Sequence, residues 1–231
     1  MRTITENYQR IREEIRQTLK ACGRPLDAVK LLAVSKGQSA ESILELQALG
    51  QTAFGENYVQ EWKGKKNFPD ERIKKIHWHF TGRLQTNKVK DLVGEIRLFH
   101  SIDRLKLAQA LEEASGKSGI VSYGFIEVDL AQEEAKGGIS EDRLEDFLTQ
   151  LNPLPHLEIV GLMILPPLSE DPEASRPYFR RLREILFDLN QKSIYRSPLT
   201  ELSMGMTNDY QVAIEEGSTW VRIGRALFYE T

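Results

Sequence analysis

Segments whose hydrophobic residues have helical spacing alternate along this chain with short apolar runs. Tyr8, Ile11, Ile15 and Leu19 recur three or four positions apart, which is typical of one face of an amphipathic helix. The apolar run at 29–35 comes next and is typical of a buried strand. The alternation continues and predicts eight strands, at residues 29–35, 52–54, 76–80, 97–100, 120–128, 157–165, 199–202 and 219–223.

Helical patterns separate these strands and begin near residues 39, 84, 103, 144, 172 and 209. Ser39 and Asp103 are expected to be the N-caps of two of these helices. Strands that alternate with helices predict an α/β fold, in which a parallel sheet closes into a single (β/α)8 TIM-type barrel. No linker or low-complexity tract interrupts residues 1–231, so we expect one domain. The segment after the last strand is short, and we expect the N-terminal helix to cover the gap.

The composition limits the partners. Lys plus Arg number 31 and Asp plus Glu 34, which gives a net charge of −3 and disfavours nucleic acid as the main partner. The single cysteine, Cys22, cannot form an intramolecular disulfide, and a reducing compartment is the simpler interpretation. The N-terminus has no apolar signal core and no run reaches membrane-spanning length, so we expect a cytoplasmic protein without membrane contact. No long apolar helix face is left unassigned, which favours a monomer.

Lys36 is the most informative residue, because it comes directly after the first predicted strand. An amine held against a low-dielectric wall loses its proton more easily and becomes a nucleophile. Such an amine can form a Schiff base with an aldehyde. The alternative is a lysine at a strand end that extends into solvent. The other residues at the same edge of the barrel decide between these two interpretations.

The chemistry of a parallel barrel lies at the C-terminal ends of its strands. Small, polar and glycine residues follow the predicted strands at this rim: Gly55-Glu56-Asn57, Thr81-Gly82, Ser101, Asp103, Asp129, Pro166-Pro167, Ser203 to Thr207, and Gly224-Arg225. Each turn alone is equally consistent with an ordinary strand end. Their position around a single lysine favours a functional site.

Two of these turns have the features of a phosphate site. Ser203 to Thr207 is a loop with hydroxyl groups and a glycine before a helix, and Gly224 permits close approach by backbone amides. Barrels often bind phosphate beside strands seven and eight. A reactive lysine together with a phosphate site suits pyridoxal 5′-phosphate, which carries an aldehyde and a phosphate. Arg222 would then face the pyridine nitrogen and weaken the ring as an electron sink. Its alternative role is an ion pair on the rim.

Several motifs occur in one order along the chain: Leu32-Ala33-Val34-Ser35-Lys36, Phe54-Gly55-Glu56-Asn57-Tyr58-Val59-Gln60-Glu61, Trp78–Lys88, Ser101-Ile102-Asp103-Arg104, Lys136-Gly137-Gly138-Ile139, Gly161-Leu162-Met163, Leu202–Met206 and Gly217–Gly224. On these motifs the sequence resembles the pyridoxal-phosphate homeostasis proteins, a family similar to the N-terminal barrel of alanine racemase. The resemblance extends from about Ile11 to Phe228. Two positions depart from the family pattern: Thr207 replaces a usual serine but keeps the hydroxyl, and Tyr229 replaces a usual glycine in the C-terminal tail.

The resemblance also implies a role for each site residue. Lys36 would carry pyridoxal 5′-phosphate as an internal aldimine, Asn57 would line the pocket near the ring, and Arg222 would lie by the pyridine nitrogen. The phosphate would be held by Ser203, Thr207, Gly224 and the amide of Arg225.

The function that the resemblance implies is pyridoxal-phosphate homeostasis. The protein would hold the cofactor and buffer it or deliver it to pyridoxal-phosphate-dependent apoenzymes. Alanine racemase needs two bases, and the resemblance implies that its second base is a tyrosine from a separate C-terminal domain of a partner subunit. We expect that domain to be absent from this chain, which favours a non-catalytic carrier. The alternative is a racemase-type enzyme with Tyr58 or Tyr210 as the second base.

Two further possibilities concern single residues. His77 and His79 occupy alternate positions of a predicted strand, so both could reach one metal ion, but no third ligand of suitable spacing is evident. Packing within the sheet is the preferred role for both. Lys136 precedes two glycines and is either a solvated loop residue, which we favour, or a secondary acceptor of the cofactor.

Overall fold

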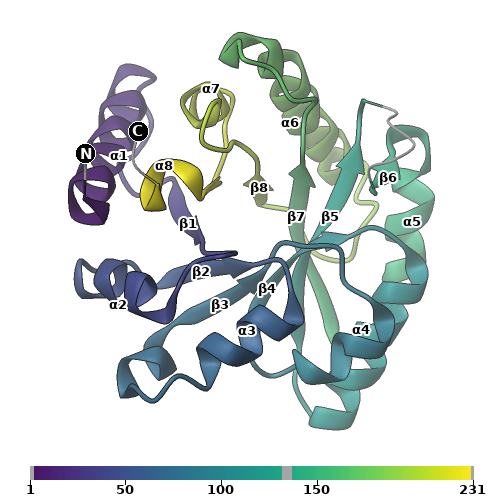
Figure 1. Cartoon of the computed structure of the whole chain (residues 1–231). Coiled ribbons are helices and arrows are strands. Elements are labelled where there is room, and N and C mark those ends of the chain that lie inside the picture. The colour runs from purple at the N-terminus through teal and green to yellow at the C-terminus, as the bar shows by residue number, and fades with distance from the viewer. Residues whose placement is uncertain (1–2, 132–136, 230–231) are drawn as a thin grey trace.

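Eight parallel strands form a closed barrel with helices around its outer surface (Figure 1). The computed structural model describes residues 3–131 and 137–229. The strands in these ranges are β1 (Lys30–Val34), β2 (Ala53–Glu56), β3 (His77–Phe80), β4 (Ile96–Ile102), β5 (Ser122–Asp129), β6 (Ile139–Ser140), β7 (Leu157–Ile164), β8 (Glu201–Ser203) and β9 (Trp220–Ile223). The ring runs β1-β2-β3-β4-β5-β7-β8-β9 and closes where β9 pairs with β1, while β6 pairs with β5 outside it. The predicted (β/α)8 barrel is confirmed.

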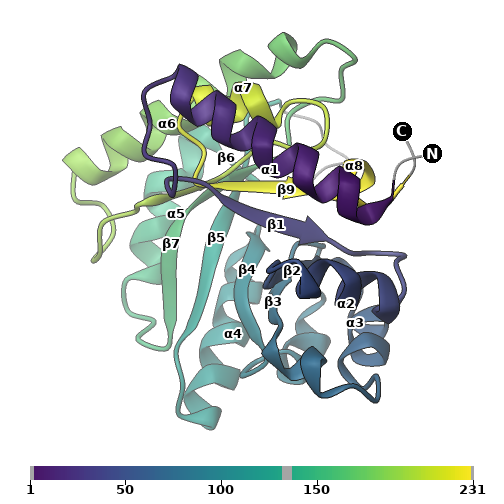
Figure 2. The same cartoon turned by 90° about the vertical axis from the view of Figure 1, so that its left-hand side faces the viewer.

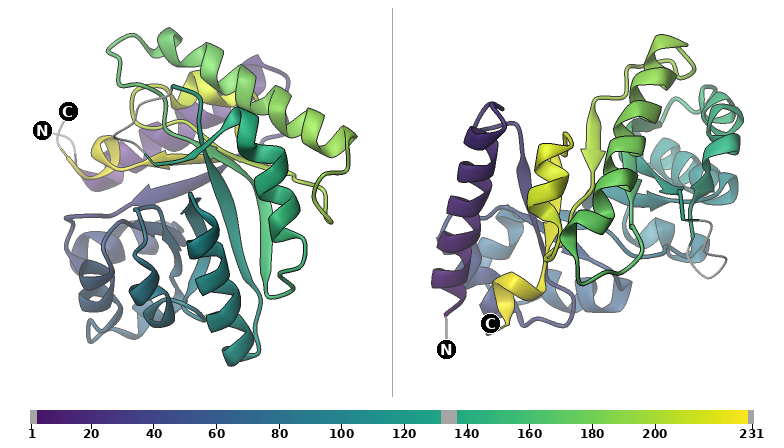
Figure 3. Two further views of the ribbon diagram at one scale, coloured as in Figure 1. Left: turned by 90° about the vertical axis from the view of Figure 1, so that its right-hand side faces the viewer. Right: turned by 90° about the horizontal axis from the view of Figure 1, so that it is seen from above.

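The helices pack on the outside of the barrel, as the view from above shows (Figure 3). They are α1 (Ile4–Ala21), α2 (Ala40–Ala48), α3 (Val59–Lys66), α4 (Leu105–Ser118), α5 (Leu144–Leu151), α6 (Arg176–Gln191), α7 (Tyr210–Glu215) and α8 (Arg225–Phe228), with 3₁₀ helices η1 (Glu71–Lys75), η2 (Thr86–Asp91), η3 (Glu141–Arg143) and η4 (Pro172–Ser175). Within the described ranges, no helix combines the length and apolar character needed to cross a membrane.

The helix predicted from about Leu84 is the 3₁₀ helix η2, at residues 86–91. The buried residues Val89 and Leu92 lie three positions apart, which matches the three-residue turn of a 3₁₀ helix. The sequence predicts a helix at this place, and the structure shows that it has the tighter 3₁₀ form.

The N-terminal helix covers the side of the barrel where only the short helix α8 follows the last strand (Figure 2). α1 contacts both α7 and α8. Asn7 of α1 is 1% exposed, and its Nδ2 donates to the carbonyl oxygens of Leu227 at 3.3 Å and Tyr229 at 3.2 Å. The expected role of the N-terminal helix is confirmed.

Side chains from the strands fill the inside of the barrel. A compact apolar cluster consists of Leu32, Ala53, Phe125, Met163 and Trp220. Two fully buried histidines pack against this cluster. The ring centroid of His79 on β3 lies 4.8 Å from that of Trp220, and the ring centroid of His100 on β4 lies 4.7 Å from that of Phe125. The centre of the barrel is therefore a packed core, as is usual for this fold.

Candidate functional site

A cavity of about 760 Å³ opens at the C-terminal ends of the strands. Its wall includes six of the seven residues predicted for the site: Lys36, Asn57, Thr207, Arg222, Gly224 and Arg225. The segment 165–168 after β7 adds an apolar part of the wall. Ser203 is the exception, because it is fully buried and is not part of the wall.

Lys36 follows β1 and lines the cavity from its rim. The residue is exposed. The next residue, Gly37, has a φ of 72°, a left-handed conformation that glycine adopts without steric cost. The chain therefore turns sharply just after Lys36, and the amine is accessible to a ligand and to solvent.

Arg222 of β9 is held by two hydrogen bonds inside the barrel. Its Nη1 donates to Oγ of Ser203 at 2.7 Å, and its Nη2 donates to the carbonyl oxygen of Ile164 at 2.8 Å. Burial lowers the pKa of Arg222 to about 10, against the opposing effect of the Asp209 and Glu127 carboxylates. The guanidinium therefore stays charged at neutral pH. Its partners are a hydroxyl and a carbonyl, so the alternative role as an ion pair on the rim is wrong.

Ser203 continues this contact as a chain of hydrogen bonds through the barrel. Its hydroxyl lies 2.9 Å from Nδ1 of His100, whose Nε2 lies 3.0 Å from Nδ1 of His79. Burial lowers the pKa of His79 to about 3 and that of His100 well below its ordinary value, so both rings are neutral. Arg222 can only donate, so Ser203 accepts from it, and because a neutral imidazole has one donor and one acceptor nitrogen, the contacts of His100 with Ser203 and with His79 run in the same direction.

The loops after β8 and β9 each contain a glycine at a closely packed position. Gly205 has a φ of 94°, and a Cβ at this position would lie 2.6 Å from a side-chain atom of α7. A Cβ on Gly224 would lie 3.0 Å from the carbonyl oxygen of Val34 in β1. The hydroxyl of Thr207 accepts a long hydrogen bond of 3.5 Å from the N–H of Ala226. The two loops predicted to bind phosphate therefore form one continuous part of the cavity wall.

Asn57 and Thr81 form another part of the wall. Oδ1 of Asn57 accepts a hydrogen bond from Oγ1 of Thr81 at 2.6 Å. Nδ2 is therefore the side-chain atom of Asn57 that can donate to a ligand. Tyr229 stands at the mouth of the cavity and is 53% exposed. The backbone of Tyr229 is extended, and its carbonyl oxygen accepts a hydrogen bond from Nδ2 of Asn7. These two features fix the conformation of the C-terminal tail at the position where the family usually has glycine.

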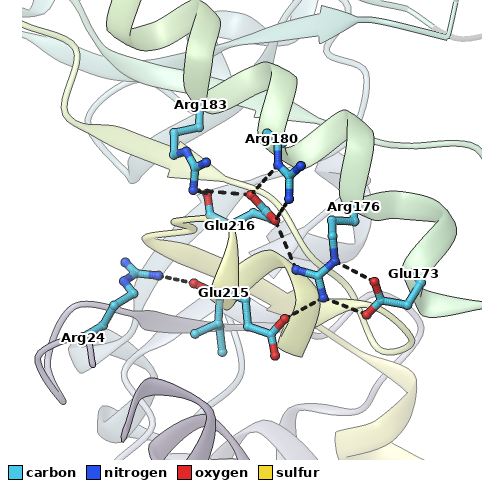
Figure 4. A network of polar contacts seen from close by, with 8 residues as sticks. Arg24, Glu173, Arg176, Arg180, Arg183, Glu215 and Glu216 are labelled. Atoms are coloured by element: carbon cyan, nitrogen blue, oxygen red, sulfur yellow. Dashed lines mark hydrogen bonds and ion pairs between the residues drawn. The ribbon is translucent and has the colours of Figure 1, made fainter. Parts of the chain in front are cut away.

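A cluster of ion pairs outside the cavity holds α7 against α6 (Figure 4). The Glu216 carboxylate, just after α7, lies 3.1 Å from Arg176, 3.0 Å from Arg180 and 3.3 Å from Arg183. Arg176 also pairs with Glu215 at 2.6 Å. Burial raises the pKa of Glu216, but the hydrogen bonds from Arg180 and Arg176 outweigh this effect and leave it below the ordinary value. The cluster fixes the helix that follows the β8 loop.

Two buried carboxyl groups lie near the C-terminal rim: Asp103, which the sequence places there, and Glu127, which it does not. The N-cap of α4 is Arg104, so the prediction of Asp103 as N-cap is wrong; Asp103 instead pairs with Arg104 and, at 3.4 Å, with Arg83. Glu127 of β5 is 8% exposed, and burial together with the Asp103 charge raises its pKa to about 7. A lone glutamate within an apolar strand is the signal that could have found it.

The other residues considered from the sequence lie away from the described wall. The Tyr210 hydroxyl donates to Glu14 of α1, on the outside of the barrel, and Tyr58 is 60% exposed without lining the cavity. Neither is placed to act as a second base. Lys136 lies outside the described residues.

The two histidines of β3 do not act together. His77 is exposed, whereas His79 is fully buried and pairs with His100. In residues 3–131 and 137–229, no group of three or more His, Cys, Asp or Glu side chains is arranged to hold a metal ion. The packing role is the one that the structure supports for His79.

Known proteins with similar sequences place this chain in a family. The family model for the N-terminal domain of alanine racemase matches residues 3–231. The pyridoxal phosphate homeostasis protein of Aquifex aeolicus is 43% identical over 225 residues, which cover 97% of each chain. This chain belongs to the pyridoxal phosphate homeostasis protein family. A further member, from Pseudomonas aeruginosa, is 39% identical over 99% of this chain and 96% of its own length.

Solved structures agree with this family assignment. PipY of Synechococcus elongatus, solved with PLP bound, is 35% identical and superposes with a TM-score of 0.79 over 93% of this chain and 99% of PipY. Alanine racemase of Corynebacterium glutamicum is 16% identical, with a TM-score of 0.68 over 94% of this chain and 59% of the racemase. At this identity the second likeness shows the shared barrel fold alone.

Proposed function

We propose that this protein binds pyridoxal 5′-phosphate (PLP) in the cavity at the C-terminal rim and takes part in PLP homeostasis, as a monomer that holds the cofactor and delivers it to PLP-dependent apoenzymes. The observation that carries the proposal is that Lys36, Arg222 and the joined loops at Thr207 and Gly224 line one cavity of about 760 Å³. The relative PipY binds PLP and shares 35% of its sequence with this chain.

The residues around the cavity fit the chemical groups of PLP. The accessible amine of Lys36 suits an aldehyde. The hydroxyl of Thr207 and the backbone amides at Gly224 and Arg225 suit a phosphate. The fixed positive charge of Arg222 suits an unprotonated pyridine nitrogen, because a nearby like charge disfavours protonation of the ring. Aldehyde, ring nitrogen and phosphate are thus each matched by a separate part of the wall, with Asn57 available near the ring.

We assign Ser203 to Arg222 rather than to the phosphate. Its hydroxyl accepts a hydrogen bond from Arg222 and approaches His100, and the residue is fully buried. A phosphate in the cavity could reach Ser203 only if these contacts were broken. The role that supports PLP binding is therefore to keep the guanidinium in place.

The arrangement suits a carrier. Bound PLP supplies an aldehyde that condenses with an amine and releases one molecule of water. Lys36 offers such an amine at an open rim, where the amine of a recipient protein can replace it. Arg222 keeps the ring a weak electron sink, which favours holding the cofactor over carbanion chemistry.

A racemase-type activity is the second candidate function, and one observation favours it. Ionisable side chains on the described wall are Lys36, Asp209, Arg222, Arg225 and Tyr229. Asp209 is engaged by the Met206 N–H at 2.7 Å and the Ser175 hydroxyl at 2.8 Å, which leaves the tyrosine at the mouth as a second base. Exchange of the α-proton of alanine in deuterated water tests this role. No exchange by the PLP-loaded wild type supports the carrier, and exchange that Tyr229→Phe abolishes supports the enzyme.

The visible absorption spectrum of the protein mixed with PLP tests the main proposal. Wild type should show the band of a lysine-bound cofactor, and borohydride reduction followed by peptide mapping should place the cofactor on Lys36. Lys36→Ala should lose the band. Lys30→Ala, at the other end of β1, is the matched control and should keep it. No band in wild type with excess PLP would contradict the proposal.

A further inference from the structure

The motif at 54–61 contains two glutamates that the proposed function does not use. Glu56, the last residue of β2, is fully buried, and Glu61 lies in the first turn of α3. Both lie close to Lys65 of the same helix, at 2.7 Å from Glu56 and 3.5 Å from Glu61. Lys65 is itself only 8% exposed. A cluster of three charges, two of them buried, therefore joins α3 to the end of β2. α3 lies on the outside of the barrel (Figure 2).

This cluster binds the backbone on both sides of Lys36. On the side before it, Nζ of Lys65 donates to the carbonyl oxygen of Ser35 at 2.7 Å. The Ser35 hydroxyl donates to Oε1 of Glu56 at 2.6 Å. On the side after it, the N–H of Gly37 donates to Oε2 of Glu61 at 2.7 Å. The peptide that carries Lys36 is thus attached to α3 at both ends, whereas the side chain itself remains free at the cavity.

The charges of the cluster favour a fixed geometry. Burial raises the pKa of Glu56, while hydrogen bonds from Lys65 and Ser35 act in the opposite direction. Oε2 of Glu56 is buried and has no hydrogen-bond partner in the described residues. A buried ion pair with a free acceptor adds less to stability than packed apolar side chains would, and fixing one geometry is a documented use of such groups. The geometry that this pair fixes is the turn at Lys36.

We infer that Glu56, Lys65 and Glu61 are positioning residues that hold the amine of Lys36 at the place where it meets the aldehyde of PLP. This inference rests on the proposed function. It predicts that loosening the cluster weakens the reaction of Lys36 with the aldehyde and leaves the binding of the phosphate and ring unchanged. A displacement of about 1 Å is enough to slow a reaction between positioned groups by about a hundredfold.

Glu61→Ala is the first variant, because Glu61 is partly exposed and its removal takes away the acceptor for the Gly37 N–H. Glu61→Gln keeps an acceptor oxygen and should restore the wild-type behaviour. Glu56→Gln tests the buried side of the cluster. The matched control is Glu201→Gln, which breaks the ion pair between Glu201 and Lys30 at the opposite end of β1.

Two ligands distinguish a positioning role for the cluster from a general loss of ligand binding. PLP reacts with Lys36, whereas pyridoxine 5′-phosphate carries an alcohol in place of the aldehyde and binds without reacting. We expect Glu61→Ala and Glu56→Gln to slow the appearance of the lysine-bound absorption band by at least about tenfold. The dissociation constant of pyridoxine 5′-phosphate, measured by calorimetry, should stay within about twofold of wild type. Glu201→Gln should change neither quantity.

The outcomes distinguish this inference from the proposed function. If wild type forms no lysine-bound band, the proposed function itself fails. If wild type forms the band and both cluster variants form it at the wild-type rate, the inference is overturned. If both variants lose affinity for PLP and pyridoxine 5′-phosphate to the same extent, the cluster supports the cavity as a whole and the positioning role is also overturned.

Discussion

Replacing Glu127 by glutamine should make the protein more stable at alkaline pH. Burial and the neighbouring Asp103 raise the pKa of this carboxyl from its ordinary 4.5 to about 7. The folded protein therefore keeps a proton on Glu127 that the unfolded chain has already lost, and stability falls as the pH rises between these two values. One pKa unit corresponds to about 1.4 kcal/mol, so the free energy of unfolding should fall by on the order of 3 kcal/mol across this window.

Glutamine matches the protonated carboxyl in shape and does not ionise, so Glu127→Gln removes this pH-dependent loss. Urea unfolding followed by tryptophan fluorescence, at about pH 5 and about pH 8, measures the free energy of unfolding of both proteins. Between these two pH values the free energy of unfolding of wild type should fall by on the order of 3 kcal/mol more than that of the variant. Parallel pH dependence of the two proteins, within about 0.5 kcal/mol, would refute the reasoning.

Glu216→Gln is the matched comparison, because Glu216 is similarly buried but surrounded by arginines. The pKa of Glu216 lies below its ordinary value. Its ionised form therefore stabilises the fold at neutral pH, and this contribution is lost as the pH falls through the lowered pKa. The same chemical change should here reduce the free energy of unfolding at neutral pH, by about 1–3 kcal/mol. Glu127→Gln should thus raise the free energy of unfolding at alkaline pH, whereas Glu216→Gln should lower it at neutral pH.

Three further changes have defined outcomes. Ser203→Ala leaves Arg222 with an unmet donor, and calorimetry should show weaker binding of pyridoxine 5′-phosphate, with a loss of about 1–3 kcal/mol in unfolding free energy. Gly205→Ala forces a left-handed backbone and a close contact with α7, and thermal unfolding should show a midpoint several degrees lower. Asn7→Ala removes two hydrogen bonds between α1 and the chain end, and hydrogen exchange should show faster opening of α8 with α1.

The fold could be predicted from the sequence because the alternation of strand and helix periods is local. Each strand of the barrel corresponds to an apolar run that can be recognised by itself. The short elements could not be defined in this way. β6 has two residues, too few to show a period, and the apolar pair Val89 and Leu92 at η2 has a spacing of three, which occurs in α-helices as well as in 3₁₀ helices.

The site could be predicted only in part, for a physical reason. Strand order fixes which residues reach the C-terminal rim, and Lys36, Arg222 and residues of the two loops line one cavity there. Whether a side chain at the rim faces the cavity or its neighbours depends on contacts between distant strands. Ser203 turns toward Arg222 and His100, which no local pattern reveals. The cluster at Glu56 also depends on contacts between distant segments, so the motif at 54–61 does not reveal it.

The contact between α1 and α8 also determines the order in which the chain can fold during synthesis. α1 leaves the ribosome before α8, and the carbonyl oxygen that Asn7 binds at Leu227 lies 220 positions later in the chain. At about 5–20 residues per second, roughly 10–40 s pass between the synthesis of α1 and that of α8. The contact between the two helices therefore forms late, and a nascent chain stalled before α8 leaves part of the packing surface of α1 uncovered. We expect such a chain to bind chaperones through the exposed apolar face of α1.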